Sequence, residues 1–245
     1  MQPGHVIRNA SPSPHANRIL AALSRKASRS FFAGVTRVEL PLGQVLCEAR
    51  TASRHVYFPN NCMVSLLAVA ERGSGLEVGL VGSEGMVGVS LALGAVTSPV
   101  KALVQGAGGA MRMSAVRFRR ELEHNRPLQR SIERCANAAM ATAMQIAVCN
   151  KEHRLEARLA RWLLMTQDRA HSNAFHITHE FLALMLGVRR AGVTRAATSL
   201  QKLRLIDYSR GNIVILDRPG LKAASCACYG ADRETYRRTL NNRMD

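Results

Sequence analysis

The chain has 245 residues, of which 47% are hydrophobic and 21% are charged. This apolar content suffices for a buried core and excludes a wholly disordered chain. Lys and Arg number 34 against 17 for Asp and Glu, a formal net charge of +17, so a polyanion such as nucleic acid is the first partner to consider. Aromatic residues make up only 4%, which argues against a large stacking surface for single strands.

The basic residues are concentrated in the C-terminal part, where residues 111–245 hold 24 of the 34. No apolar run reaches the roughly 18 to 20 residues that span a bilayer. The first residues include Pro3, Pro12 and Pro14 and lack the apolar region of a secretory signal. We therefore expect a cytoplasmic protein with a frayed N-terminal segment and no membrane partner.

The six cysteines form no Cys-x-x-Cys pair, so neither a disulfide framework nor a zinc site is predicted. They are Cys47, Cys62, Cys135, Cys149, Cys226 and Cys228. Only Ala227 separates the last two, which is shorter than the usual metal-binding loop. Reduced thiols, in the core or at the surface, are the expectation, with no metal ligands.

The N-terminal half reads as a short helix followed by strands. Residues 18–32 predict a weakly amphipathic helix. Short apolar runs bounded by Gly, Pro, Asn and Ser then predict strands at 35–40, 45–48, 55–58, 63–70, 76–81 and 101–104. Six or more such strands without a long helix between them indicate an antiparallel sandwich or jelly roll.

Glycines recur every third residue at Gly79, Gly82, Gly85 and Gly88, a spacing that allows tight turns and close approach to a ligand. A ligand loop and a purely structural corner of the roll are both compatible with this pattern. Neither a GxGxxG nor a GxxxxGK[ST] phosphate motif is present.

A helical region begins after Ser114, a suitable N-cap, and a long helix opens at Pro127. Apolar residues recur on it at spacings of three and four, as in a short coiled coil, at Ile132, Ala136, Ala139, Ala143 and Ile146. Met140, Met144 and Val148 form a second apolar face. One face can thus pack within the chain and the other on a partner, which favours a homodimer helix.

A further helix over 151–169 is expected to bury Trp162 as the anchor of a second core rather than as a base-stacking residue. The segment that follows carries a helix-turn-helix pattern. Thr178 is a good N-cap, and Ala183, Gly187 and Val193 supply a small residue, a turn glycine and a branched apolar residue. The second helix of the motif is predicted from about Arg189 to Lys202.

Charge supports a DNA-binding role for this motif. Six basic residues and one acid lie between Leu186 and Arg210, while Val193, Ala196, Ala197, Leu200 and Leu203 give the second helix an apolar face. Arg190 and Arg195 lie in its N-terminal half, where side chains reach base edges in a major groove. Two apolar strands around 211–212 then form a hairpin, or wing, with Arg210 at its tip near the phosphate backbone.

From about residue 30 to 217 the chain resembles the cyclic-AMP receptor protein and fumarate-nitrate regulator family of bacterial transcription regulators. The most specific stretch is ITHEFLALMLGVRRAGVTRAATSLQKLRLID with its hairpin YSRGNIVIL. The resemblance implies a homodimer that reads a palindrome, with base contacts from Arg190, Ala191 and Arg195, and it implies contact with RNA polymerase. Phosphate contacts are expected from Thr178, Arg189, Thr194, Lys202 and Arg210. The family often has Glu where Ala191 stands, so this protein is expected to read a DNA half-site different from that of the best-known members.

The sensor part departs from the family pattern. In the family, the loop that binds the cyclic nucleotide has the pattern Gly-x-x-Gly-Glu. This chain reads GMVGV instead, with Val89 in place of the ribose-binding Glu. Where an Arg would take the cyclic phosphate stand Pro99 and Val100, with only Lys101 nearby. A buried phosphate without a cation is disfavoured, so cyclic AMP is not expected. The pocket, if one exists, is expected at Gly85, Gly88, Val89, Val100 and Lys101.

Other cofactors follow from the same resemblance. The N-terminal cysteine cluster that holds an iron-sulfur cluster in one branch is missing, because no Cys precedes Cys47. Haem remains an alternative cofactor, with His55 and His124 as candidate ligands. The effector is therefore unknown.

The predicted class is α+β, with a β-roll sensor over 1–114, a dimerisation helix over 115–150, a winged helix-turn-helix over 151–225 and a tail over 226–245. The predicted function is a DNA-binding transcription regulator rather than an enzyme. HEFLA at 179–183 lacks the second His of a zinc HExxH motif, and no nucleophilic triad is recognisable. The alternatives are an enzyme acting on nucleic acid and a constitutive architectural DNA binder whose roll senses nothing.

Overall fold

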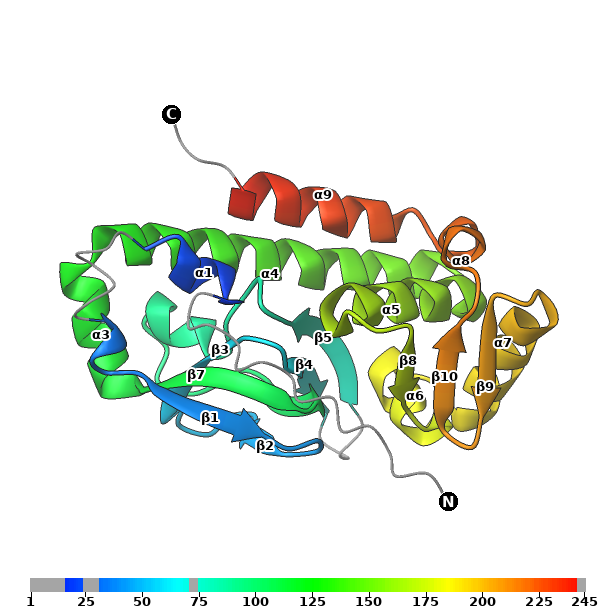
Figure 1. Cartoon of the computed structure of the whole chain (residues 1–245), viewed down its shortest axis with the longest axis horizontal. Coiled ribbons are helices and arrows are strands. Elements are labelled where there is room, and N and C mark those ends of the chain that lie inside the picture. Colours follow the sequence, from blue (N-terminus) through cyan, green and yellow to red (C-terminus); the bar gives the residue numbers. More distant parts are fainter. Residues whose placement is uncertain (1–15, 24–30, 71–74, 242–245) are drawn as a thin grey trace, which may run out of the picture.

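A computed structural model describes residues 16–23, 31–70 and 75–241. The N-terminal segment of 1–15, for which a frayed start was expected, lies outside the described residues. In Figure 1 a strand-rich part and a smaller helical part lie side by side beneath one long helix. Among the described residues no helix is long and apolar enough to cross a membrane.

The strand-rich part is an antiparallel roll of two sheets. One has the order β1-β7-β3, built from Thr36–Leu40, Gly108–Ser114 and His55–Pro59. The other has the order β2-β6-β4-β5, built from Val45–Cys47, Lys101–Gly106, Met63–Val69 and Gly75–Val81. Their facing sides bury aliphatic residues such as Val64, Val104 and Ala110. The expected jelly roll is therefore confirmed.

Two differences from the predicted elements occur in the roll. Strand β7, at the centre of its sheet, was not among the predicted strands, because Gly108 and Gly109 give it little strand propensity of its own. Of the predicted helix over 18–32, α1 covers Arg18–Ala21 and Phe31 and Phe32 are also helical, with a break at 22–23; residues 24–30 lie outside the described part. The 3₁₀ helix η2 (Val89–Leu93) follows the glycine-rich segment.

Helices connect the roll to the C-terminal part. Ser114 caps α3 (Ala115–His124), as predicted, by accepting a hydrogen bond from the backbone N of Arg117. The long helix α4 (Arg126–Glu152) carries Pro127 in its first turn. Next come α5 (Leu155–Ala170), β8 (Ala174–His176), α6 (His179–Leu186), α7 (Arg190–Lys202), β9 (Ile206–Ser209), β10 (Asn212–Ile215), α8 (Arg218–Ala224) and α9 (Cys228–Asn241).

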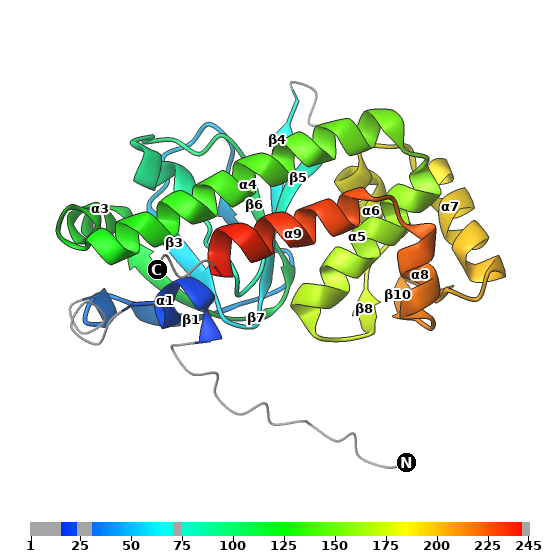
Figure 2. The same ribbon diagram turned by 90° about the horizontal axis from the view of Figure 1, so that it is seen from above.

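Helix α4 is covered on two sides by its own chain. The roll lies along one side, and α9, formed from the expected tail, lies along another, as Figures 1 and 2 both show. Ile132 packs in the core that α4 shares with the roll, and Ile146 is also buried. These two residues were expected on the dimer seam, but Ile132 packs against the roll and Ile146 is buried among other parts of the same chain.

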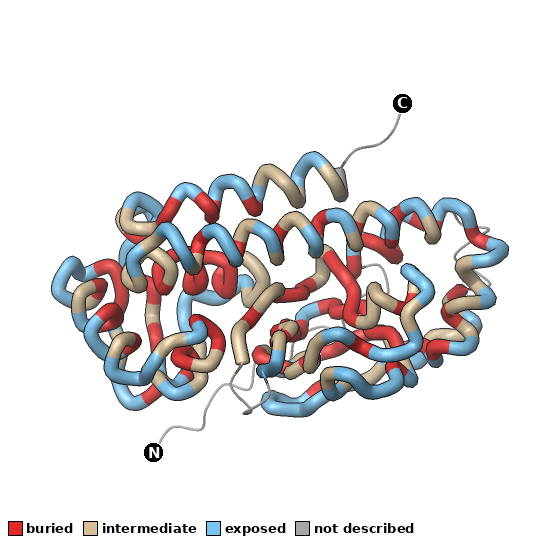
Figure 3. Tube along the Cα trace, turned by 180° about the vertical axis from the view of Figure 1, so that it is seen from behind, coloured by how far each residue is buried: buried red, intermediate tan, exposed pale blue. Residues whose placement is uncertain are grey.

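A third side of α4 stays open to solvent. Its exposed apolar side chains are Met140, Met144 and Val148, each more than half exposed, and Ala136, Ala139 and Ala143 are only partly buried. Figure 3 shows exposed positions recurring along this helix. The free apolar stripe is therefore the second face of the sequence analysis rather than the predicted seam.

The roll and the C-terminal part share one core. Met63, Leu67 and Leu80 from the roll belong to the same buried cluster as Trp162 of α5 and Val193 of α7. Trp162 is 5% exposed, so its predicted role as a core anchor is confirmed. Because the core is continuous, a change in the roll can act directly on the C-terminal helices.

Candidate nucleic-acid interface

The turn between α6 and α7 has the local chemistry that the sequence indicated. The side chain of Thr178 accepts a hydrogen bond of 3.1 Å from the backbone N of Phe181 and so caps α6. Gly187 ends α6 with φ of +63°, a conformation that glycine adopts at little cost. The backbone N of Val188 then donates to the carbonyl O of Ala183, which closes the turn.

Helix α7 is held by its apolar face. Val193, Ala196, Ala197 and Leu200 are each at most 1% exposed and pack in the shared core. Small side chains let α7 approach α5 closely: a Cβ on Gly192 would lie 3.1 Å from Leu155 Cδ2. The orientation of α7 is thus set by close contact along its inner side.

The outer side of α7 is cationic and open. Arg189, Arg190, Ala191, Thr194, Arg195 and Lys202 are all exposed. Arg189 at the N-cap provides no side-chain cap, so amide groups of the first turn are left for another acceptor. The helix lies at the end of the molecule remote from α3 and β1 (Figures 1 and 2), and the roll leaves the side chains of Arg190 and Arg195 uncovered.

A polar network that the sequence analysis missed joins the two helices of the motif to the wing. The Thr194 hydroxyl lies 3.0 Å from His179 Nδ1 and 3.2 Å from the carbonyl O of Arg190. The His179 ring stacks on Tyr208 with centroids 4.3 Å apart. Burial, with a smaller contribution from the Arg190 cation, lowers the pKa of His179. In the sequence, His179 stands out only as the first His of an incomplete HExxH motif.

The wing is a three-stranded sheet of order β8-β10-β9. The hairpin turn is Arg210–Gly211, because Asn212 pairs with Ser209; the turn thus lies one residue earlier than predicted. Both turn residues have positive φ, 49° and 84°, as the type of turn common in two-residue hairpins requires. Arg210 is exposed at the tip, and Tyr208 Oη donates to the carbonyl O of Ile177, which anchors the wing.

The predicted effector residues lie in the roll but bring no free cation together. Gly88 begins η2 with φ of +92°, and Val89 packs against the roll core. Lys101 Nζ lies 3.1 Å from Glu48 Oε1, so an anion would meet a lysine already paired with a carboxylate. Gly85 is buried and Val100 is half-buried.

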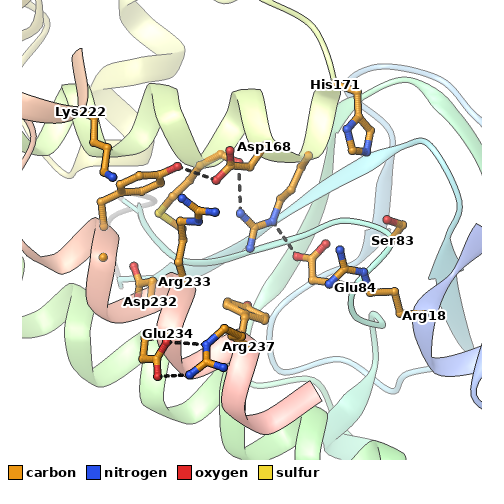
Figure 4. Close-up of a pocket in the computed structure, with 15 residues that line it drawn as sticks. Arg18, Ser83, Glu84, Asp168, His171, Lys222, Asp232, Arg233, Glu234 and Arg237 are labelled. Atoms are coloured by element: carbon orange, nitrogen blue, oxygen red, sulfur yellow. Dashed lines mark hydrogen bonds and ion pairs between the residues drawn. The ribbon is translucent and has the colours of Figure 1, made fainter. Parts of the chain in front are cut away.

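A polar cavity of about 550 Å³ lies where the loop after β5, the end of α5 and α9 meet (Figure 4). None of the five predicted effector residues lines it. Arg169 Nε lies 2.7 Å from Glu84 Oε1, and the guanidinium lies over the Tyr236 ring. This ion pair joins the roll to the C-terminal helices across the wall of the cavity.

The two histidines left open for haem, His55 and His124, are not members of the group of four potential metal ligands that converges in the described residues. His124 Nδ1 lies 2.9 Å from the carbonyl O of Arg120 at the end of α3. His55 lies on β3 beside Tyr57, and its pKa is lowered by burial and by neighbouring Arg112 and Arg54. Within the described residues, the group of metal-binding side chains that does converge is a different one, Cys149, His153, Cys226 and Cys228.

This convergence differs from the expectation of isolated thiols. Cys226 and Cys228 looked unsuitable as ligands because only one residue separates them. The fold supplies the other two side chains from the end of α4 and the residue after it. Only the docking of α9 on α4 brings the two sequence segments together.

An antiparallel roll, a long helix and a basic winged helix-turn-helix together define a two-part DNA-binding regulator. Residues 157–224 match the model of the Crp-like helix-turn-helix domain. A comparison with curated protein sequences finds no significant match.

Solved structures of regulators share this fold over most of the chain. The c-di-GMP responsive global regulator CLP of Xanthomonas campestris is 17% identical, with a TM-score of 0.66 over 79% of this chain and 100% of that one. FixK2 of Bradyrhizobium japonicum is 13% identical, with a TM-score of 0.67 over 79% and 98%. A CRP/FNR-family transcriptional regulator of Thermus thermophilus is 21% identical, with a TM-score of 0.61 over 78% and 98%. Residues 157–224 therefore form a Crp-like helix-turn-helix domain, and the chain shares its fold with these solved regulators.

Proposed function

We propose that this regulator acts as a homodimer that reads a two-fold symmetric DNA site through α7. The observation that carries the proposal is the exposure of Arg190 and Arg195 on a helix whose opposite face is completely buried. A helix held in this way can enter a major groove without rearranging its own domain. If both α7 helices bind the same face of the duplex, the half-sites lie about 34 Å apart.

Base readout and phosphate binding fall to different side chains. Arg190, Ala191 and Arg195 are assigned to base edges, and an Arg donates two hydrogen bonds to guanine O6 and N7. Arg189, Lys202 and Arg210 flank α7 or lie on the wing and are assigned to phosphates. Thr178 and Thr194 are assigned to phosphates as well. Thr194 also orders His179, so its loss should affect the motif and the contact together.

The dimer contact is assigned to the open stripe of α4. Met140, Met144 and Val148 follow one another at four-residue spacing and are exposed, whereas the other long sides of α4 are covered. Partly buried Ala136 and Ala143 border the stripe and allow close approach of a second helix. Two such stripes form a self-complementary contact of the kind found in two-fold dimers.

The ligand of the roll is not cyclic AMP bound in the family manner. The argument rests on Lys101, whose ammonium lies 3.1 Å from Glu48, and on the apolar Val89 and Val100. A cyclic phosphate would need an unpaired cation there. In a thermal-shift assay of the full-length protein, cyclic AMP should leave the melting temperature unchanged, because only a ligand that binds the native state raises it.

The DNA proposal is tested by selecting a binding site from random duplexes and measuring affinity over a salt series. Arg190→Ala and Arg195→Ala should cost about 1 to 3 kcal/mol and relax preference at single base positions. Arg210→Ala should weaken all sequences equally and reduce the salt slope by about one. Arg120→Ala on α3, exposed at the opposite end of the molecule, serves as the control.

Two outcomes would refute the assignment. The base-readout roles are wrong if neither Arg190→Ala nor Arg195→Ala changes the preference among selected sites. If wild-type protein binds all duplexes equally tightly at each salt concentration, the chain is an architectural binder instead.

A further inference from the structure

The end of α4 and the loop before α9 bring four potential metal ligands together. Cys149 lies in the last turn of α4, and His153 follows that helix as its cap. Cys226 precedes α9 and Cys228 is its first residue. The two segments are more than 70 residues apart in sequence, yet all four ligand atoms lie within 4.8 Å of one another.

The distances fit a tetrahedral ion. With metal–sulfur bonds of about 2.3 Å and metal–nitrogen bonds of about 2.0 Å, the sulfurs of a zinc tetrahedron lie about 3.8 Å apart, and sulfur and nitrogen about 3.5 Å. Here Cys149 Sγ lies 3.5 Å from Cys226 Sγ. Cys228 Sγ lies 3.7 Å from His153 Nδ1. Two opposite edges of the tetrahedron are therefore already formed.

The surroundings suit a structural site. The three cysteines are buried in a small cluster of their own, with Ala157 packed against it. Gln145 Nε2 lies 3.0 Å from Cys228 Sγ and can orient that sulfur. Three thiolates around a divalent cation leave one negative charge, and partly buried Arg158 and buried Arg161 both act electrostatically on Cys149 and Cys226.

Local geometry also keeps the ligands in place. Cys149 and His153 are four residues apart, and the backbone N of His153 donates to the carbonyl O of Cys149 at 3.1 Å. The backbone N of Tyr229 donates to the carbonyl O of Cys226, which folds 226–229 into a tight turn. That turn lets Cys226 and Cys228 serve one ion in spite of their short spacing.

We propose that Cys149, His153, Cys226 and Cys228 bind one zinc ion in a structural Cys₃His site. Four protein ligands fill the tetrahedron, so no position is left for a substrate. The ion fastens the start of α9 to the end of α4, next to the passage from the long helix into the DNA-binding part. This site is independent of the DNA contacts proposed above.

The first experiment uses wild-type full-length protein purified under reducing conditions. Elemental analysis should find about one zinc per chain. After removal of zinc with a chelator, Co²⁺ should give the visible bands of a tetrahedral site and a thiolate charge-transfer band in the near ultraviolet. Zinc should then displace the cobalt and abolish both signals. Because binding requires deprotonated thiols, uptake should release protons.

Variants identify the ligands. Cys149→Ser, Cys228→Ser and His153→Gln should each weaken zinc affinity by at least about tenfold and alter the cobalt spectrum. Cys135→Ser and Cys47→Ser, cysteines outside the cluster, are the matched controls, and His124→Gln is the control for the histidine. The controls should retain wild-type zinc content and spectrum.

Stability provides an independent readout. The chelator should lower the melting temperature of wild-type protein by mass action and lower that of Cys228→Ser by less. Wild-type protein that takes up neither zinc nor cobalt while its thiols are reduced would overturn the proposal. It would equally be overturned if the cobalt spectrum survived in Cys149→Ser and Cys228→Ser, or if oxidant joined Cys149 to Cys226 while zinc stayed bound to the protein.

Discussion

The indole Nε1 of Trp162 on α5 donates a hydrogen bond of 3.0 Å to Glu77 Oε1 on β5. The other carboxyl oxygen of Glu77 lies 2.7 Å from Ser65 Oγ, and that hydroxyl also contacts Gln105 Oε1. One hydroxyl hydrogen cannot serve both acceptors. Ser65 donates to the ionised Glu77 carboxylate, whereas a protonated Glu77 would donate to Ser65 Oγ and leave the Ser65 hydroxyl hydrogen for Gln105. The chain of contacts ties the roll to the DNA-binding part.

Stability should therefore depend on the protonation of Glu77. Burial raises the pKa of Glu77 from 4.5 to about 7 although Ser65 and Trp162 oppose the shift. Between these values the folded state holds the proton more strongly than the unfolded state. The contribution of Glu77 to the free energy of unfolding is thus most favourable below pH 4.5. It is lost as pH rises toward 7, by at most about 1.4 kcal/mol per pH unit.

Glu77→Gln should remove this dependence, because the amide keeps an acceptor for Trp162 and supplies a donor for Ser65. We expect the variant to be more stable than wild type at pH 8 and to show a flatter profile between pH 5 and 8. Chemical denaturation at a series of pH values measures the difference between the two proteins. Parallel profiles would contradict a proton shared between Glu77 and Ser65.

The buried ion pair between Arg161 on α5 and Asp232 on α9 should fix the docking of α9. The side chains are only 8% and 5% exposed, and Arg161 Nε lies 3.0 Å from Asp232 Oδ2. Asp232→Ala leaves a buried guanidinium without a partner and should cost about 3 to 5 kcal/mol.

The double variant Arg161→Met with Asp232→Leu should recover most of this loss, since no charge then stays buried. Urea denaturation of wild type, Asp232→Ala and the double variant measures their free energies of unfolding. An effect of Asp232→Ala below about 1 kcal/mol, the range of exposed pairs, would show that the pair is open to solvent.

The open stripe of α4 leads to a prediction about the oligomeric state of the protein. Met144→Glu places a charge in the middle of the proposed contact and should convert the dimer to a monomer, because a buried unpaired carboxylate is costly. Light scattering after gel filtration measures the mass. Leu42→Glu, at a residue that is 56% exposed in the turn between β1 and β2, should stay dimeric. A dimeric Met144→Glu protein would place the contact elsewhere.

The turn of the helix-turn-helix touches the roll, and this contact can be tested at Gly187. A Cβ there would lie 2.8 Å from Leu76 Cδ1 on β5, and the φ of +63° is unfavourable for alanine. Gly187→Ala should cost more than the about 1 to 2 kcal/mol of backbone strain alone.

Gly43→Ala provides the strain reference, because Gly43 also has positive φ but open space around it. Adding Leu76→Ala to Gly187→Ala should relieve the steric part, which a double-mutant cycle in urea separates. Equal losses in the free energy of unfolding for Gly187→Ala and Gly43→Ala would mean that the Leu76 side chain repacks without a steric penalty.

The sequence by itself determined the parts whose signals are local. Thr178, Gly187 and the apolar face around Val193 lie within one short segment, and the helix-turn-helix, its cationic outer side and the wing follow from their spacing. The same holds for the strands of the roll bounded by turn residues, and for the N-cap at Ser114. Periodicity and turn chemistry act over a few residues, so a single segment contains the information.

Tertiary structure alone decided which apolar stripe of α4 stays free. Ile132 packs against the roll, Ile146 is buried within the chain, and α9 covers another side, so Met140, Met144 and Val148 are left exposed. The cysteine–histidine cluster and the buried contacts of Glu77 with Ser65 and Trp162 arise in the same way, from segments far apart in the chain. The physical reason is that burial and ligand distances depend on which elements dock, and spacing along one helix does not specify its neighbours.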